Sequence, residues 1–157
     1  MQTFLPLPDF NASMKVLDPK RLGNQVYREA LTLIRGGWKN HPASKMWEGH
    51  YHALALYALA GIDELELRGK HYPHHRLTFE SYLNEHPNTG MPWWIGCNEF
   101  HASHRAALLY KDPKWYGKFG WVEEAAVPNA KGSLPYFWPL NKGANNELGR
   151  EVTGSNV

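Results

Sequence analysis

Residues 18–37, DPKRLGNQVYREALTLIRGG, decide the fold, because they have the features of a helix with defined ends. Asp18 can cap the first free N–H groups, and Pro19 suits the first turn, where its missing N–H is not needed. Gly36 and Gly37 can end the helix, because glycine adopts the left-handed conformation at little cost. At about 100° per residue, one face of the predicted helix carries an apolar stripe formed by Leu22, Val26, Ala30 and Leu33.

Glu29 interrupts this stripe, since it lies seven residues after Leu22 on the same face. Burial makes the ionisation of a carboxylate costly, and a neighbouring cation such as Arg28 would offset that cost. Such breaks in a local pattern are expected at functional sites. A glutamate at the edge of a groove, paired with an arginine or reaching solvent, would give the same pattern. Periodicity alone leaves both interpretations open.

The bulk properties are those of a cytoplasmic protein with no membrane span. The 157 residues suffice for one domain with a hydrophobic core. No run of about 18 apolar residues occurs, and the start, MQTFLPLPDF, lacks the features of a secretory signal. Cys97 is the only cysteine, which excludes an internal disulfide and a cysteine-rich zinc site and is typical of a reducing compartment.

The charge is unevenly distributed, although the net charge is only +2. Residues 1–45 hold seven Lys and Arg against three Asp and Glu, residues 46–100 three against seven, and residues 101–121 four against one. If the two basic stretches meet in space, they form a positive face. The seven Trp, eight Tyr and six Phe suit stacking on bases, but aromatic residues are also ordinary core material.

The rest of the chain predicts an all-α fold without strands. We expect an extended, proline-broken start over residues 1–11, a short helical turn over 11–17, and further helices over 43–68, 76–85 and 98–111. Gly61 indicates a kink or a more solvated end in the second of the long helices. The prediction is a compact single domain, residues 1–141, of three to four main helices with an extended N-terminal arm and an aromatic-rich C-terminal segment. Residues 142–157 are polar and glycine-rich, which predicts a flexible tail.

Nine histidines raise the hypothesis of a metal enzyme. His101 and His104 are three apart on a predicted helix and could reach one ion, and His71, His74 and His75 lie close together in the sequence. No HExxH motif or paired carboxylates accompany them, so we expect no metal. No serine-hydrolase elbow and no phosphate-binding glycine motif occurs either.

Several short motifs, in order over roughly residues 2–121, resemble those of the pyrimidine-dimer DNA glycosylases. They are QTFLPLPDF near the start, RLG at residues 21–23, the triplet Tyr27-Arg28-Glu29, MWEGHY at residues 46–51 and FHASHRAALLYKDPKWYGKFG at residues 100–120. The resemblance implies an all-α DNA glycosylase with no metal or organic cofactor.

The resemblance also implies a mechanism in which the chain's terminal amine attacks the sugar, expels the base and leaves an imine, assisted by Glu29. α-Amino groups titrate at about 7.7–8.0 and are usable nucleophiles near neutral pH. Gln2 is large and should leave Met1 in place. The amine therefore belongs to Met1, is displaced by one residue, or takes no part, so Met1, Gln2 and Thr3 are the candidate positions. Without the amine, Glu29 would activate water, giving a glycosylase without abasic-site lyase activity.

The expected partner is double-stranded DNA carrying a damaged or modified base, bound by a monomer in a bacterial cytoplasm or nucleoid or encoded by a phage. Thr32 stands where the family has an arginine, which leaves photodimer specificity open. The rival hypotheses are an inactive DNA-binding module of the same fold and a His-based metal enzyme. The predicted DNA contacts are Arg21, Asn24, Gln25, Arg28, Arg35, Lys45, His50, His101, His104, Arg105, Lys114, Trp115, Tyr116 and Lys118.

Overall fold

The computed structural model describes residues 1–140 and 150–153 and is all-α in character, with one short pair of strands. The tail predicted for residues 142–157 lies outside the described residues, except for 150–153. No helix in the described part of the chain is long and apolar enough to cross a membrane. The helical elements are α1 (Phe10–Val16), α2 (Pro19–Asn24), η1 (Gln25–Ala30), α3 (Leu31–Ile34), α4 (Pro42–Trp47), α5 (Tyr51–Leu67), α6 (Pro73–Glu85), α7 (Asn98–Lys111), α8 (Pro113–Tyr116) and η2 (Gly117–Phe119).

The helix predicted over residues 18–37 is present and consists of α2, η1 and α3 in succession. The Asp18 carboxylate accepts a hydrogen bond from the Arg21 amide (3.4 Å) at its start, and Gly36 has a φ of +85° just after its end. The predicted apolar stripe is buried. The middle element, η1, is a π-helix, which the sequence did not predict. Such segments are rare and are frequent at functional sites.

The single helix predicted over residues 43–68 is wrong, because the structure has two helices there. Gly49 has a φ of +80°, a left-handed conformation that ends α4 before α5 begins at Tyr51. Gly61 causes no kink but allows a close approach of η1 to α5. A Cβ atom at Gly61 would lie only 2.8 Å from Cγ2 of Val26, so the glycine lets the two helices pack closely.

Two other expectations need correction. Helix α6 begins at Pro73, which places His74 and His75 on a helix and not in a loop. Strands are also present: β1 (Tyr136–Pro139) pairs antiparallel with β2 (Arg150–Thr153). All four residues of β1 are buried, and the Phe137 amide donates to the Ser103 hydroxyl on α7 (3.1 Å). Because the residues of β1 are buried on both faces, they lack the alternation by which strands are usually recognised.

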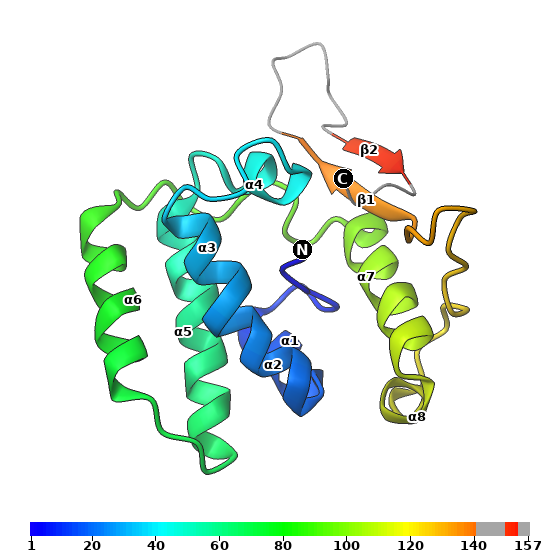
Figure 1. The fold of residues 1–157 in the computed structure, drawn as a ribbon, viewed down its shortest axis with the longest axis horizontal. Coiled ribbons are helices and arrows are strands. Elements are labelled where there is room, and N and C mark those ends of the chain that lie inside the picture. The colour runs from blue at the N-terminus through cyan, green and yellow to red at the C-terminus, as the bar shows by residue number, and fades with distance from the viewer. Residues whose placement is uncertain (141–149, 154–157) are drawn as a thin grey trace.

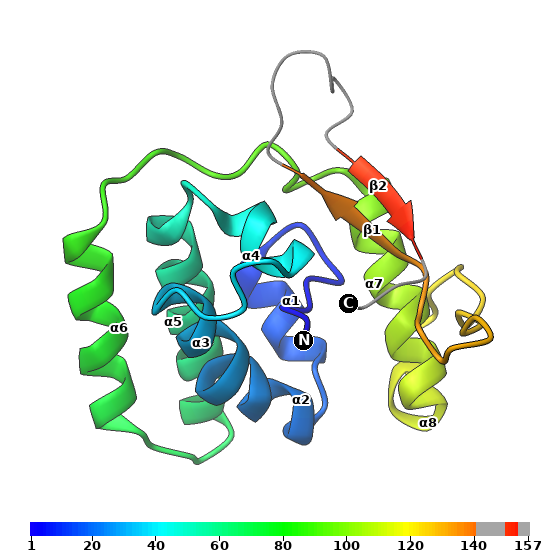
Figure 2. The ribbon, with the colours of Figure 1, turned by 45° about the horizontal axis from the view of Figure 1, so that its top comes forward.

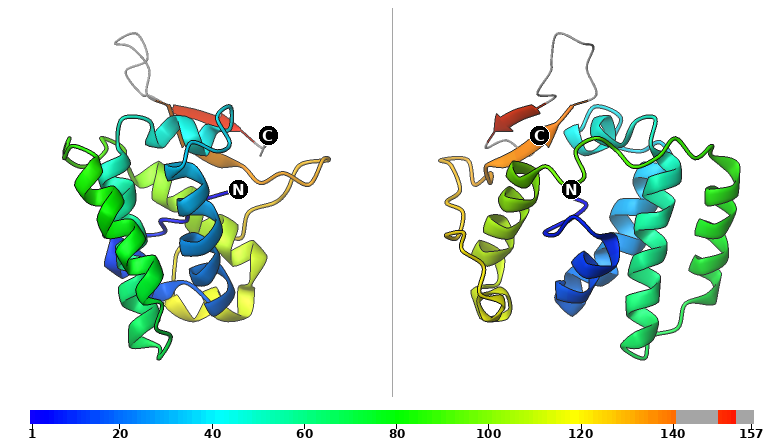
Figure 3. Two further views of the ribbon diagram at one scale, coloured as in Figure 1. Left: turned by 60° about the vertical axis from the view of Figure 1, so that its left-hand side comes forward. Right: turned by 180° about the vertical axis from the view of Figure 1, so that it is seen from behind.

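The N-terminal arm (residues 1–9) runs through the middle of the molecule. Figure 1 shows its start between α7 on one side and the helices α3 and α5 on the other, and Figure 2 and the right-hand view of Figure 3 agree. Leu5 fixes the arm to α7, since its amide donates to Nδ1 of His104 (2.9 Å) and its carbonyl accepts from Nδ1 of His101 (2.7 Å). Nε2 of His101 in turn accepts from the Gly96 amide (2.9 Å).

This arrangement corrects the prediction that His101 and His104 contact DNA. Their exposed fractions are 1% and 0%, so neither ring reaches the surface. Both ring nitrogens of His101 and one of His104 are hydrogen-bonded within the protein, so the pair is not arranged to bind a metal ion. Among the described residues, no group of three His, Cys, Asp or Glu side chains could hold one.

The two buried histidines predict a loss of stability in mild acid. Burial lowers the pKa of His101, and lowers that of His104 well below its usual 6.5. The unfolded chain therefore binds protons below about pH 6.5 that the folded protein does not, so stability present above that pH is lost as the pH falls. We expect the free energy of unfolding, measured in urea, to fall by up to about 1.4 kcal/mol per pH unit for each such proton.

Replacing His104 with Asn keeps an acceptor for the Leu5 amide but removes the titrating ring. This variant should be less stable at pH 7, because it leaves a cavity, yet should lose stability less steeply between pH 6.5 and 5. His71→Asn, at an exposed position, is the matched control. An unchanged slope in His104→Asn would show that the acid sensitivity arises elsewhere.

Candidate active site

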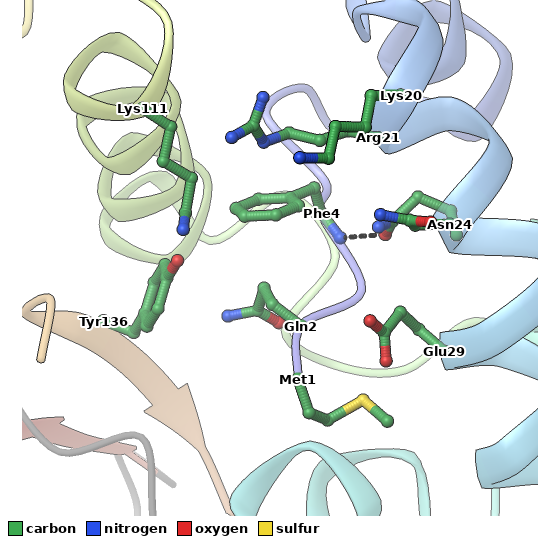
Figure 4. Close-up of a pocket in the computed structure, with 10 residues that line it drawn as sticks. Met1, Gln2, Phe4, Lys20, Arg21, Asn24, Glu29, Lys111 and Tyr136 are labelled. Atoms are coloured by element: carbon green, nitrogen blue, oxygen red, sulfur yellow. Dashed lines mark hydrogen bonds between the residues drawn. The ribbon is translucent and has the colours of Figure 1, made fainter.

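A pocket of about 200 Å³ lies where the N-terminal arm begins. Its walls come from the arm, from the consecutive elements α2 and η1, and from the end of α7 and β1, which lie much later in the sequence (Figure 4). The lining residues are Met1, Gln2, Phe4, Lys20, Arg21, Asn24, Gln25, Glu29, Lys111 and Tyr136.

Glu29 projects into this pocket from the π-helical segment and is half-buried (Figure 4). Burial raises the pKa of its carboxyl group, while the N-terminal ammonium and then Arg28 act in the opposite direction. The ammonium of Met1 is therefore close enough to Glu29 to stabilise its negative charge. The structure thus brings together the carboxylate and the chain's amino end, which are 28 positions apart in the sequence.

Buried hydrogen bonds hold the arm in position behind the pocket. Oε1 of Gln25 accepts hydrogen bonds from the Phe4 amide (2.6 Å) and from the Tyr57 hydroxyl. The Thr3 hydroxyl accepts from Nε1 of Trp47 (2.9 Å). Thr3 is fully buried and does not line the pocket, so of the three candidate amine positions only Met1 and Gln2 lie there.

Three cationic side chains line the same pocket. Nη1 of Arg21 lies 3.1 Å from the Asp18 carboxylate, which fixes its direction. Although Lys111 as a whole residue is exposed, partial burial of its ammonium group lowers its pKa, and repulsion from Arg21 and Lys20 adds to this effect. A pocket with one carboxylate among several cations suits a substrate with several negative charges.

Only some of the predicted DNA contacts lie at the pocket. Arg21, Asn24 and Gln25 line the pocket, although Gln25 is itself buried and uses its carbonyl to hold the arm. His50 is half-buried just before α5, and Arg35 is exposed and donates to the Tyr82 hydroxyl (3.0 Å). The remaining exposed members of the set are Arg28, Lys45, Lys114 and Lys118.

One further predicted contact, Tyr116, is wrong, and the predicted contact Arg105 is engaged within the protein. The guanidinium of Arg105 forms a bidentate ion pair with Glu123 (2.7 and 2.8 Å) and donates to the Pro6 carbonyl (2.8 Å). Tyr116 is fully buried, and its hydroxyl bonds to Asp18 at the start of α2. Tyr116 therefore presents no surface to DNA, whereas a DNA contact of Arg105 stays a prediction.

Trp115, from the same aromatic segment, is only half-buried. Its Nε1 donates to the Val16 carbonyl (2.7 Å), and the Lys118 ammonium lies 3.6 Å from the centre of its ring. The indole is therefore fixed by the protein, with a cation over one face. It remains a candidate for contact with DNA.

Sequence reasoning missed three polar residues of the pocket: Lys20, Lys111 and Tyr136. Lys20 adjoins Arg21 and lies in the basic stretch of residues 1–45, which could have indicated it. Lys111 and Tyr136 are more than 80 residues from Glu29. No local pattern connects positions so far apart, and only the packing of α7 and β1 against the arm brings them to the pocket.

The structure thus places a carboxylate and the chain's amino end in one pocket of a mostly helical protein, with three cationic side chains in its lining. Residues 1–80, just over half of the chain, match the family model of pyrimidine dimer DNA glycosylases, and the chain belongs to this family. No curated protein and no solved structure matched the chain. The matched residues include the arm and Glu29, whereas Lys111 and Tyr136 lie beyond them.

Proposed function

We propose that this DNA glycosylase, acting as a monomer, excises a damaged or modified pyrimidine base from duplex DNA and then cleaves the abasic site through an imine on its terminal amine. One observation carries the proposal: Met1 and Glu29 line the same pocket. The positive charge of the N-terminus also opposes the rise in the pKa of Glu29 that burial causes. A nucleophile in the same pocket as a group that can exchange protons with it is the arrangement that covalent catalysis needs.

In the proposed reaction, the lone pair of the Met1 nitrogen forms a bond to C1′ while the bond from C1′ to the base breaks. The electron pair of that bond leaves with the base, which then takes a proton from water. Glu29 accepts the proton lost by the attacking nitrogen and returns it to the ring oxygen as the sugar opens to an iminium. Loss of a C2′ proton then expels the 3′ phosphate by β-elimination.

The proposed role of Glu29 also includes stabilisation of positive charge on the sugar as the base departs. A carboxylate fixed in a partly desolvated pocket does this without reorganisation during the reaction. The cations Lys20, Arg21 and Lys111 would hold the phosphates on either side of the extruded nucleotide. Opening the duplex costs a few kcal/mol, and these phosphate contacts would offset part of that cost.

The proposal is tested with a panel of duplexes that each carry one modification. The panel holds a pyrimidine photodimer, thymine glycol, 5-hydroxymethylated and glucosylated pyrimidines, and an abasic site, and each duplex is scored for base loss and strand cleavage. We expect base loss from at least one modified pyrimidine and cleavage of the abasic duplex. Tight binding with no base loss from any duplex would instead support the inactive DNA-binding module.

The pocket cations predict a specific salt dependence. Each phosphate contact contributes a slope of about −0.9 to the logarithm of the binding constant against the logarithm of salt concentration. Lys20→Ala and Lys111→Ala should each make this slope shallower by about 0.9, measured by fluorescence anisotropy on an abasic duplex. Lys70→Ala, between α5 and α6 and outside the pocket, is the control. Equal slopes in all four proteins would show that the pocket cations do not contact phosphate.

A further inference from the structure

The side chain of Gln2 holds a hydrogen-bond donor that the protein does not use. Its Oε1 accepts from the Thr3 amide (2.9 Å), which fixes the orientation of the amide, because only the oxygen can accept that bond. Nε2 therefore points the other way. Only 5% of the residue is exposed, and Nε2 is buried without a hydrogen-bond partner among the described residues.

An unsatisfied buried donor is costly and uncommon in folded proteins. Gln2 lines the pocket, and Figure 4 shows its amide nitrogen directed toward the wall formed by Lys111 and Tyr136. A bound substrate that supplied an acceptor at this place would satisfy the donor. In the free protein, Nε2 of Gln2 is thus already placed to donate a hydrogen bond to an oxygen atom of a ligand.

The neighbours of this donor are donors as well. Tyr136 is buried, and burial raises the pKa of its hydroxyl, so the hydroxyl keeps its proton at neutral pH. Lys111 carries an ammonium group. Together with Nε2 of Gln2, these groups form a wall that can donate hydrogen bonds, whereas Glu29 lies across the pocket on the side of η1 (Figure 4).

The placement of Glu29 and the donor wall on opposite sides of the pocket has a chemical consequence, which rests on the proposed function. A nucleophile attacks C1′ from the side opposite to the departing base. With the terminal amine acting beside Glu29, the base departs toward the wall of Gln2, Lys111 and Tyr136. As the bond breaks, negative charge develops on N1 of a pyrimidine and is shared with its O2 carbonyl.

We propose that Gln2 is a further catalytic residue, which donates a hydrogen bond from Nε2 to the O2 carbonyl of the departing pyrimidine. Donors placed where charge develops lower the barrier of such a step. O2 is present in every pyrimidine, so this contact selects pyrimidines as a class and tolerates changes at C5 and C6. Lys111 and Tyr136 complete the same wall, and they come from outside residues 1–80, the part that matches the family.

The test separates recognition of the base from every other role of Gln2. Gln2→Met removes the donor, and Gln2→Glu removes it while keeping an acceptor for the Thr3 amide. Both residues are large, so Met1 should stay in place. Single-turnover base loss is measured on the modified-pyrimidine duplex that wild type excises fastest, and the Kd for an abasic duplex, which has no base, is measured by fluorescence anisotropy. Asn84→Leu, at an exposed amide on α6, is the control.

We expect both Gln2 variants to lose about tenfold or more in the rate of base loss, the usual effect of removing one hydrogen bond from a transition state. The Kd of Gln2→Met for the abasic duplex should stay within about twofold of wild type, whereas the added carboxylate of Gln2→Glu should weaken binding through repulsion of phosphate. Unchanged base loss in both variants, or base loss and abasic binding that weaken together in Gln2→Met, would overturn the role of Gln2. Wild-type protein that removes no base from any duplex would contradict the proposed function itself and remove the basis of this inference.

Discussion

Replacing Glu29 with Gln should reduce base loss by about 10³-fold, the range typical of removing a general base and a preplaced charge. Gln has the same shape but neither accepts a proton nor carries a negative charge, so it cannot stabilise a cationic sugar. The measurement is single-turnover base release from the best duplex of the panel. Binding should be unchanged or tighter, because a carboxylate that repels phosphate has been removed.

Two observations keep this prediction separate from a folding defect. Burial raises the pKa of Glu29, so its ionisation near pH 7 opposes folding, and Glu29→Gln should melt at the same temperature as wild type or roughly 1–3 °C higher. Glu80→Gln, at an exposed position on α6, should retain full activity. Base loss at the wild-type rate in a folded Glu29→Gln protein would show that this carboxylate takes no part.

Extending the chain by a Gly-Ser pair ahead of Met1 should abolish cleavage of abasic DNA, with a loss of about 10³-fold. Two residues can move the amine by up to about 7 Å, and a misplacement of 1 Å can already cost about 10²-fold. The arm cannot shift to compensate, because its backbone is fixed at Phe4 by Gln25 and at Leu5 by the two α7 histidines. Cleavage is measured by gel electrophoresis of an end-labelled abasic duplex.

The same Gly-Ser pair added after Val157 is the matched control, and this protein should cleave like wild type. The N-terminally extended protein should still bind the abasic duplex, since the cations of the pocket are unchanged. If it cleaved at the wild-type rate, the nucleophile would have to be another group.

The sequence predicted the helix over residues 18–37 because its signals are local. Asp18 and Gly36 mark its ends. Leu22 and Val26 are spaced as on one face of an α-helix, and this spacing predicted both the helix and its buried face. Glu29 stood out for the same reason, as a charged group within an otherwise apolar stripe. The π-helical turn that carries Glu29 could not be predicted. It is only six residues long, and over so short a segment the spacing of apolar residues does not distinguish a π-helix from an α-helix.

The errors in the candidate site share one physical origin: the side chains concerned act through contacts distant in sequence. His101 and His104 on a helix have the same pattern whether they face DNA or a buried backbone, and only the position of the N-terminal arm decides between these. Arg105 has the sequence pattern of a surface cation, and its ion pair with Glu123, 18 positions further along the chain, is visible only in the fold. Lys111 and Tyr136 carry no local mark at all, and they reach the pocket because α7 and β1 pack around the arm.

The most direct test of the central claim is to locate the covalent bond between protein and DNA. The protein is incubated with a duplex containing one abasic site in the presence of borohydride, which reduces an imine to a stable amine, and the trapped peptide is identified by mass spectrometry. The proposed mechanism predicts that the adduct lies on the α-amino group of Met1. An adduct on a lysine such as Lys111, or cleavage of the duplex with no adduct, would contradict it.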